Sequence, residues 1–541
     1  MKTIFKVDKI VSPGIDMDSR YLLINDDKIE AIYKDGDINI GSNDCEIKDY
    51  SGYILTPGLI DTHNHLFTTA LQLTFGFDLS PNNQTNFSIL LDKIREFSRT
   101  SQFSWIVGRG INSDYFTEKR LPNRYILDQA DNEKPIFLVH QSGHAAVCNS
   151  IAIKLSGLDR ATPDPDGGVI ERDSNGVPTG ILHEKAAMDI VRSNIPPYTK
   201  DQYKTALLNA QELYLKDGIT CVKDTGGNGA YIDEAQRIEV LNEADYEGNL
   251  KMRIAVALPI FTRDEVEGKI NLLSKLIPSD HLMSAGFKIF LDGSGVSKTA
   301  WMKEDWNINL DRKDIGNKGV IRWDLNQLKE VFDKVSELDC NVSIHAIGDA
   351  AVEHILSLIK HEKELGKKAS FAIVHSYIPT DQDIQLMKQY NVAVETQPSF
   401  IYFLGSQIAN NLGRERYERM FPLRSYLNNN INVCISTDAP VSPFNPLYGI
   451  YSSINRTLKD NKFKDKIINK NECITFPEAI ECYTIKPAHI LRNNRIGSLE
   501  TGRLADFVIW DRSVLHLDPE NVEKIHPKAV YISGKKVSGF N

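Results

Sequence analysis

The segment "GLIDTHNHL", residues 58–66, has two histidines separated by one residue at the end of an apolar run. Successive side chains of a β-strand point to opposite faces, so His63 and His65 lie on one face together with Asp61. Imidazole nitrogens are common ligands of divalent metal ions. The segment therefore predicts a buried strand, and the two imidazoles at its end are candidate metal ligands.

Downstream of this segment, apolar strands and amphipathic helices alternate over residues 200–490. Residues 203–215 and 349–365 each place apolar side chains on one helical face. Continuously apolar strands that alternate with helices indicate a parallel sheet covered by helices. Together with residues 53–61 the pattern gives eight strands, which predicts a (β/α)8 TIM-like barrel. The other seven expected strands are residues 218–224, 252–260, 286–293, 341–348, 370–376, 391–395 and 431–440.

The two ends of the chain consist of short β-strands rather than helices. Residues 21–25 and 29–33 form an expected hairpin within residues 1–57, and residues 491–541 contain further strands. We expect the two ends to pair in one small β-sandwich domain. The metal-dependent barrel domain is then residues 58–490.

An insertion is expected after the first barrel strand. A barrel of this kind typically needs about 250 residues, and the excess lies mainly in residues 66–199. This inserted subdomain includes a Gly-, Pro- and Asp-rich stretch with a hairpin that turns at residues 173–176. Because the insertion follows a strand, we expect it to cover the carboxyl-terminal mouth of the barrel and to shape specificity.

The composition excludes several classes of partner. The 541 residues carry 63 basic and 72 acidic side chains, a net charge of −9, and no Lys/Arg-rich run, so nucleic acid is not an expected ligand. The sequence offers neither a signal peptide nor an apolar run of the roughly 20 residues that span a membrane. The seven scattered cysteines form no C-x-x-C motif. We expect a cytoplasmic protein that acts on a small molecule, and a homodimer is left open.

Four more polar residues lie at or near the ends of later barrel strands. Lys288 lies in the fourth, His345 and His375 end the fifth and sixth, and Asp438 ends the eighth. Taken singly, each has an ordinary explanation, such as a hydrogen-bonded histidine, a lysine that reaches solvent or a turn aspartate. Together with the first-strand pair they meet at the face of the barrel where active sites form, which indicates a divalent metal site.

Lys288 is the unusual member of this set, because a protonated amine would be repelled by metal ions. Reaction of its neutral amine with CO₂ gives an anionic carbamate whose two oxygens can bridge two metal ions. Burial and nearby cations favour the neutral amine that this reaction requires. We therefore expect Lys288 to be carboxylated.

These residues resemble the amidohydrolase superfamily, and most closely its family 3, the branch that includes N-substituted formamide deformylase. The resemblance implies that the six residues hold up to two divalent ions, with zinc favoured. One departure is Val374, since the family often has Glu immediately before the sixth-strand histidine. The motifs that carry the resemblance are TPGLIDTHNH, GRGINSDYF, LPNRYILDQA, GHAAVCNS, PTGILHE, FKIFLDGS, VSIHAIGDAAV, STDAPVSPFNPL, YTIKPAH and GSLETGRLADFVIWDR.

The implied reaction is hydrolysis of a C–N bond, in an amide or an N-formyl or N-acyl amine, by a metal-bound hydroxide. Asp438 is the expected general base and general acid, in addition to being a ligand. His144 of the insertion and Trp301, beyond the fourth strand, are candidate substrate contacts. Phe400, Tyr402 and Phe403, in the loop after the seventh strand, either form an apolar wall or pack that loop. Deamination, lactone hydrolysis and a non-catalytic binding role are the alternatives.

Overall fold

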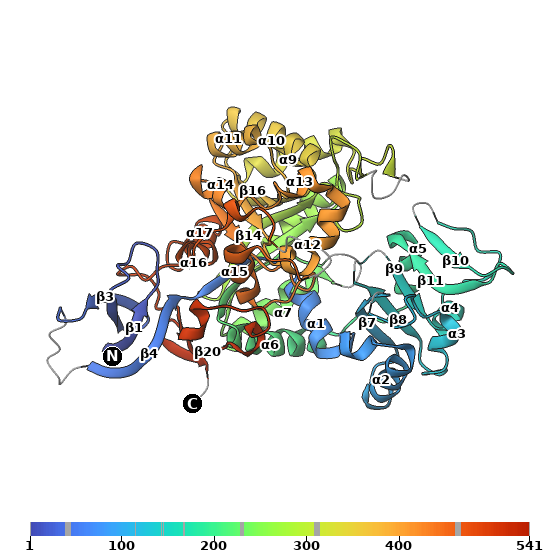
Figure 1. The fold of residues 1–541 in the computed structure, drawn as a ribbon, viewed down its shortest axis with the longest axis horizontal. Coiled ribbons are helices and arrows are strands. Elements are labelled where there is room, and N and C mark those ends of the chain that lie inside the picture. Colours follow the sequence, from blue (N-terminus) through green and yellow to red (C-terminus); the bar gives the residue numbers. More distant parts are fainter. Residues whose placement is uncertain are drawn as a thin grey trace. The chain divides into compact units, whose positions relative to one another are not determined.

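The computed structural model divides into two compact units and describes most of the chain (Figure 1). The first unit comprises residues 1–66, 211–226 and 234–541, and the second residues 67–210 and 227–233. None of the described helices combines the length and the apolar character that a membrane span requires. The described residues are 2–37, 45–79, 81–113, 115–141, 143, 145–165, 168–227, 232–307, 314–459 and 467–539.

The first unit contains an eight-stranded sheet in which every neighbouring pair of strands is parallel. The strands follow one another in chain order, and helices lie between successive strands (Figure 1). All eight strands expected from the sequence are present, which confirms the (β/α)8 class. They are β5 (Leu59–Asn64), β12 (Ile219–Asp224), β13 (Arg253–Ile260), β14 (Leu282–Phe290), β15 (Asn341–Ala346), β16 (Ser370–His375), β17 (Ala393–Thr396) and β18 (Val433–Ile435).

Hydrogen bonds between the first and last strands nearly close the barrel. The backbone N–H of Asp438 donates to the carbonyl of His63 at 2.8 Å. The carboxylate of Asp61 accepts from the backbone N–H of Thr437 at 3.0 Å and from its hydroxyl at 2.6 Å. Asp61 is fully buried, and burial raises its pKa to about 6. The seam between β5 and β18 is therefore joined by both backbone and side-chain bonds.

The helices that follow the strands bury one apolar face each, as the spacing in the sequence predicts. In α10, Val352, Ile355 and Ile359 are completely buried. Asp324 begins α9, where its side chain accepts from two backbone N–H groups. The helices of this unit are α7 (Glu234–Tyr246), α8 (Val266–Leu273), α9 (Leu325–Glu337), α10 (Asp349–Glu364), α11 (Asp381–Gln389), α12 (Ser399–Leu412), α13 (Arg414–Tyr417), α14 (Leu423–Asn428), α15 (Pro446–Asn455), α16 (Phe476–Tyr483) and α17 (Ile485–Ile490); α6 (Lys200–Lys216) runs into it from the second unit.

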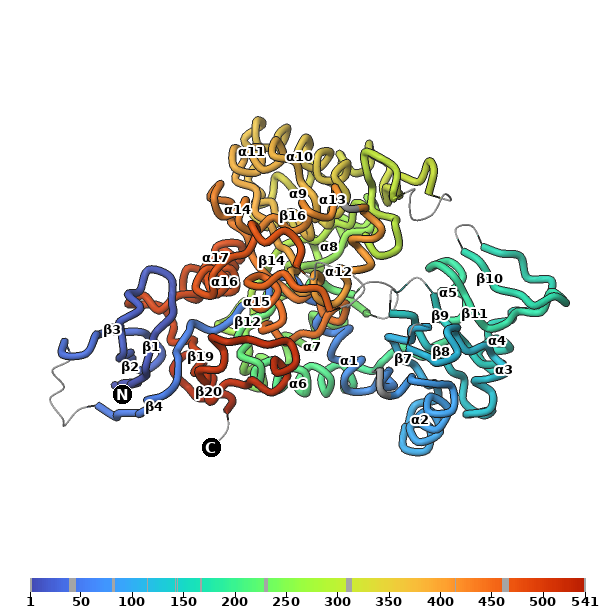
Figure 2. The backbone as a smooth tube through the Cα atoms, in the orientation of Figure 1, coloured from blue at the N-terminus to red at the C-terminus, as the bar shows by residue number. Residues whose placement is uncertain are grey.

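The two ends of the chain pair in one seven-stranded sheet, as expected (Figure 2). The N-terminal strand β4 lies beside the C-terminal strand β19, and only β1 and β4 pair in parallel. The rings of Phe5, Phe507 and Tyr531 pack face to edge or stacked in its core, with centroids 4.6–5.0 Å apart. In sheet order the strands are β21 (Lys535–Ser538), β20 (Pro527–Ile532), β19 (Phe507–Asp511), β4 (Cys45–Pro57), β1 (Lys2–Ile10), β2 (Ser19–Asn25) and β3 (Lys28–Lys34).

The second unit has its own sheet, with an apolar cluster on each face. Leu138 packs with Leu90 and Ile94 of α2, whereas the preceding Phe137 packs with Met188 of α5. Alternate side chains of one strand thus serve two cores. The strands are β6 (Phe77–Asp78), β7 (Ile106–Ile111), β8 (Ile136–His140), β9 (Ala145–Cys148), β10 (Val169–Arg172) and β11 (Pro178–His183); the helices are α1 (Leu66–Phe75), α2 (Phe87–Thr100), α3 (Arg124–Leu127), α4 (Ser150–Leu155) and α5 (Glu184–Arg192).

Candidate metal centre

Three of the predicted ligands meet at the seam between the first and last barrel strands. The Nε2 atoms of His63 and His65 each lie 3.3 Å from Oδ1 of Asp438. Two ligands of one tetrahedral zinc ion, each about 2.0–2.1 Å from the metal, lie about 3.4 Å from one another. All three side chains are buried, and their candidate ligand atoms lie within 4.8 Å of one another. The spacing fits a metal ion bound between them.

The two other predicted histidines lie next to this trio. The rings of His345 and His375 have centroids 4.5 Å apart, and His375 lies 5.5 Å from His63. Burial, more than any other factor, lowers the pKa of His345 well below its ordinary value and that of His375 to about 4. Both imidazoles are therefore neutral near pH 7, which is the form that binds metal.

Backbone carbonyls fix which ring nitrogen can face a metal ion. Nδ1 of His65 donates to the carbonyl of Gly226 at 2.7 Å, and Nε2 of His345 donates to the carbonyl of Gly293 at 2.8 Å. Because a carbonyl only accepts, each of these nitrogens carries the proton, and the other nitrogen keeps its lone pair. Such outer bonds orient metal-binding histidines. They leave Nε2 of His65 and Nδ1 of His345 available.

His375 is held in the same way by a side chain from the next strand. Its Nδ1 lies 2.6 Å from Oε1 of Gln397. The amide nitrogen of Gln397 in turn donates to the hydroxyl of Ser436 at 2.8 Å and to the carbonyl of Glu395 at 3.2 Å. Since both donors of the Gln397 amide are used, its oxygen is the atom that faces His375. This arrangement leaves Nε2 of His375 for a ligand.

Lys288 is fully buried in β14 and is unusual in having no polar contact. Its Nζ makes no hydrogen bond to any described residue, and Nδ1 of His63 and Oδ1 of Asp438 are likewise without a hydrogen-bond partner. Buried polar atoms in proteins almost always have partners, so the unpartnered Nζ of Lys288 and Oδ1 of Asp438 indicate a missing ligand. Burial lowers the pKa of Lys288 to about 7, so a substantial share of its amine is neutral.

Asp438 is ionised and lies in a strained backbone conformation. Burial opposes its ionisation, but the imidazoles of His63, His65 and His375 outweigh burial and hold its pKa well below the ordinary value. Asp438 has φ 55° and His375 has φ 75°, a left-handed region that non-glycine residues seldom adopt. Strain of this kind is concentrated at functional sites.

Two residues near this centre were not singled out from the sequence. The buried carboxylate of Asp292 accepts the backbone N–H groups of Trp301 and Gly348 at 3.0 and 2.9 Å, and its Oδ1 lies 3.4 Å from Nε2 of His345. The ring of Tyr377 lies 6.1 Å from that of His375. The signal for Asp292 is its position at the carboxyl end of the expected fourth strand, two residues beyond the end of β14. Tyr377 follows the sixth-strand histidine by two residues.

The predicted substrate contacts have mixed outcomes. Trp301 lies beyond β14 with its ring 5.7 Å from that of His354, so its role toward substrate stays a prediction. His144 lies outside the described residues, and the covering role of residues 66–199 also stays a prediction. Phe400 stacks on His375 with centroids 6.3 Å apart, and it belongs to helix α12 rather than to a loop.

Val374, the departure from the family pattern, is completely buried. It pairs in register with His345 of β15 on one side and with Glu395 of β17 on the other. The apolar side chain of Val374 therefore lies beside His345. The buried carboxylate in register with Val374 is that of Glu395, on the next strand.

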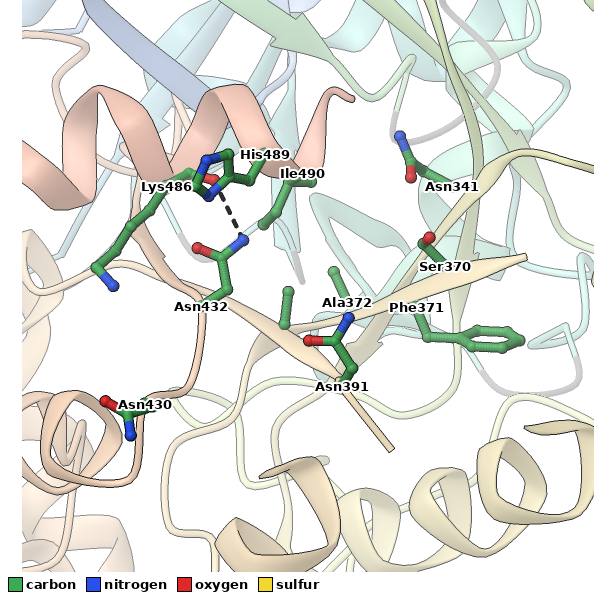
Figure 3. A pocket seen from close by; sticks show the side chains of 11 residues that line it. Asn341, Ser370, Phe371, Ala372, Asn391, Asn430, Asn432, Lys486, His489 and Ile490 are labelled. Atoms are coloured by element: carbon green, nitrogen blue, oxygen red, sulfur yellow. Dashed lines mark hydrogen bonds between the residues drawn. The ribbon is translucent and has the colours of Figure 1, made fainter. Parts of the chain in front are cut away.

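A cavity of about 410 Å³ lies at the opposite, amino end of the same strands (Figure 3). Its walls include Asn341 and Ser370, the first residues of β15 and β16, and Lys486 and His489 of α17. The amide of Asn432 donates to the carbonyl of Lys486 at 3.2 Å. The candidate ligands do not line this cavity. Ligand geometry, rather than cavity size, therefore locates the candidate centre.

Comparison with known proteins identifies one family and several relatives. A family model described as "Amidohydrolase family" matches residues 46–538. YtcJ of Bacillus subtilis (strain 168) is 28% identical over 533 residues, which cover 95% of this chain and 97% of YtcJ. N-substituted formamide deformylase of Arthrobacter pascens is 26% identical, with 91% and 89% covered. The fold resembles an uncharacterized metal-dependent hydrolase from Pyrococcus horikoshii OT3, at TM-score 0.76 and 23% identity, with 96% and 99% covered.

Proposed function

The chain belongs to the amidohydrolase family, a family of hydrolases, and on this premise we propose that it hydrolyses a C–N bond with the help of divalent metal ions. The observation that carries the proposal is the position of Asp438 Oδ1, 3.3 Å from Nε2 of both His63 and His65. The substrate would be an amide, in an N-formyl or N-acyl amine.

Zinc is the proposed metal, because buried imidazole and carboxylate ligands suit it. Bound there, zinc would act as a Lewis acid and supply an activated water near neutral pH. His63, His65 and Asp438 would hold one ion, and His345 and His375 a second. Lys288, as a carbamate, would join the two sites. Its burial and unpartnered Nζ support this role.

Asp438 is the proposed proton carrier. Its carboxylate lies 3.3 Å from both first-strand imidazoles, at the proposed metal site, where it could accept a proton from the attacking water. The protonated carboxyl group of Asp438 can then deliver the proton to the leaving nitrogen, which must be protonated for the C–N bond to break. A serine or cysteine nucleophile is not needed in this scheme.

The substrate class is supported by one relative. N-substituted formamide deformylase of Arthrobacter pascens matches 91% of this chain, although at 26% identity. A small-molecule amide is the proposed substrate. The cytoplasmic location and a homodimer stay predictions from the sequence.

Elemental analysis of protein purified without chelators tests the metal, and a panel of N-formyl and N-acyl amines tests the reaction. We expect up to two zinc ions per chain and release of an amine that requires them. Removal of metal by a chelator and its return should abolish and restore the activity. A protein that takes up no divalent ion on reconstitution would contradict the proposal, and turnover of aminopurines or lactones alone would redirect it to the alternative reactions.

A further inference from the structure

The barrel interior holds a second buried lysine, Lys223 of β12. Its Nζ donates to the two carboxylate oxygens of Glu395 in β17 at 2.5 and 2.6 Å and to the hydroxyl of Ser343 in β15 at 2.9 Å. The Ser343 hydroxyl donates to Glu395 at 3.0 Å. An ammonium group has three N–H donors, so these bonds use all of them. The three fully buried side chains form a closed group that joins three strands of the barrel.

This group lies beside Lys288. Ser343 pairs in register with Lys288 on the neighbouring strand, so the two residues lie side by side in the sheet. Burial is the main reason for the lowered pKa of Lys288. Among the charges around Lys288, the carboxylate of Glu395 has the largest effect, and it acts against burial by raising that pKa. Nevertheless the Nζ of Lys288 makes no hydrogen bond to a described residue. Two buried lysines thus lie near one carboxylate, and only one is paired with it.

Without Lys223, the carboxylate of Glu395 would be an uncompensated buried charge. Leaving such a charge unpaired is strongly destabilising, so a nearby amine would be drawn to it. Lys288 is the neighbouring amine, and it makes no hydrogen bond to the described part of the chain. Pairing with Glu395 would direct Lys288 toward the interior group and away from the histidines.

We propose that Lys223 is a positioning residue that occupies Glu395 and thereby leaves the Nζ of Lys288 free to serve the metal centre. The inference rests on the proposed function, in which Lys288 contributes to metal binding. A simple structural brace is the competing explanation, and it makes Lys223 and Glu395 equally important. Under the positioning role, loss of Lys223 weakens metal binding more than loss of Glu395 does. Only the loss of Lys223 leaves the carboxylate of Glu395 free to pair with Lys288.

The test measures metal content and melting temperature for Lys223→Met, Glu395→Gln and the double variant Lys223→Met/Glu395→Leu. We expect Lys223→Met to bind metal more than about 10-fold more weakly, the scale of a lost outer-sphere contact. Glu395→Gln should keep its metal even though its melting temperature falls. The double variant should regain metal affinity close to that of the wild type.

Each result decides the inference. Full metal content in Lys223→Met overturns it, and so does equal loss in Lys223→Met and Glu395→Gln, or a folded double variant without metal. If Lys223→Met alone does not fold, the other two variants still distinguish positioning from bracing. Absence of metal from the wild type would instead contradict the proposed function, so the two failures are separate.

Discussion

At the carboxyl ends of the barrel strands, buried atoms of His63, Lys288 and Asp438 have no hydrogen-bond partner among the described residues. At the amino ends, the equally buried Arg253 and Asp506 pair through two bonds of 2.7 and 2.8 Å. Unpaired buried polar atoms are costly, so they persist where a ligand completes them. The contrast indicates that the carboxyl end serves chemistry and that the amino end stabilises the fold, which is the usual division in such barrels.

The largest expected effect comes from removing both first-strand imidazoles. His63→Asn/His65→Asn should lose bound metal and more than about 100-fold of the activity, since loss of outer partners alone costs about 10–100-fold. Elemental analysis and kcat/KM measure this. The far-ultraviolet circular dichroism spectrum should be that of the wild type, which serves as the folding control. Retention of metal by this variant would place the centre elsewhere.

Substitution of Lys288 should remove metal but leave a repairable site. Lys288→Ala deletes a buried amine that has no hydrogen-bond partner within the described ranges, and we expect loss of metal and activity. Short carboxylic acids such as acetate should restore part of both, because a free carboxylate can replace a carbamate in the space left. Activity and metal content are measured with and without the acid. If Lys288→Ala were fully active, Lys288 would have no role in the centre.

Asp438→Asn keeps the shape of the side chain but removes the proton acceptor. We expect kcat to fall about 10²-fold or more, as for loss of a general base, while metal and fold are retained. Steady-state kinetics and elemental analysis measure the two quantities in one preparation. Loss of metal would mean that Asp438 is chiefly a ligand, and near-normal kcat would move the base to His345 or His375.

The pH dependence of stability should reveal the buried imidazoles in the metal-free protein. His375 has a folded pKa of about 4 against an ordinary value of 6.5. Between these values the unfolded chain binds more protons, so the free energy of unfolding falls as pH decreases from 6.5 to 4. His375 alone contributes about 3 kcal/mol to this loss.

Urea unfolding of wild type and His375→Gln across this pH range isolates that contribution. The comparison is needed because burial raises the pKa of Asp61 to about 6 and that of Asp292 to about 7. A carboxyl group with a raised pKa increases the free energy of unfolding as pH falls, which opposes the effect of His375. The wild type should lose more stability than the variant as pH falls. Parallel curves for the two proteins would contradict the prediction.

The smallest effect on catalysis is expected at the amino end. Arg253→Met leaves the carboxylate of Asp506 buried without its partner, which should destabilise the fold by about 3–5 kcal/mol. The kcat per folded molecule should be unchanged, because Arg253 is the first residue of β13 and lies at the end of the strand opposite the candidate ligands. Urea unfolding and active-site-normalised kinetics measure the two. A fall in kcat comparable to that of Asp438→Asn would remove the distinction between the two ends.

Much of the architecture was predictable because it depends on local patterns. Buried strands with continuous apolar residues alternate with amphipathic helices, and His63 and His65 mark the end of the first strand by their spacing alone. The orientation of Asp438 was not predictable from strand alternation, because β18 ends at Ile435. A left-handed backbone and the hydrogen bond to His63 orient it instead.

The interior group around Lys223 was also invisible in the sequence. Lys223 and Glu395 are separated by 172 positions, and each looks like an ordinary charged residue within an apolar strand. Only the closed barrel brings Lys223 of β12, Ser343 of β15 and Glu395 of β17 into contact. Sequence periodicity indicates which face a residue occupies, but it does not specify which charges meet across the interior.

The seam between β5 and β18 determines when the metal centre can form during folding. Asp61 and Thr437 are 376 positions apart, and the bonds that join them also bring His63 and His65 to Asp438. Contacts between such distant segments are late and entropically costly. A nascent chain therefore lacks the centre until almost 440 residues have emerged. Metal would then bind only chains that have closed the barrel and would stabilise that state by mass action, so that metal content also reports completed folding.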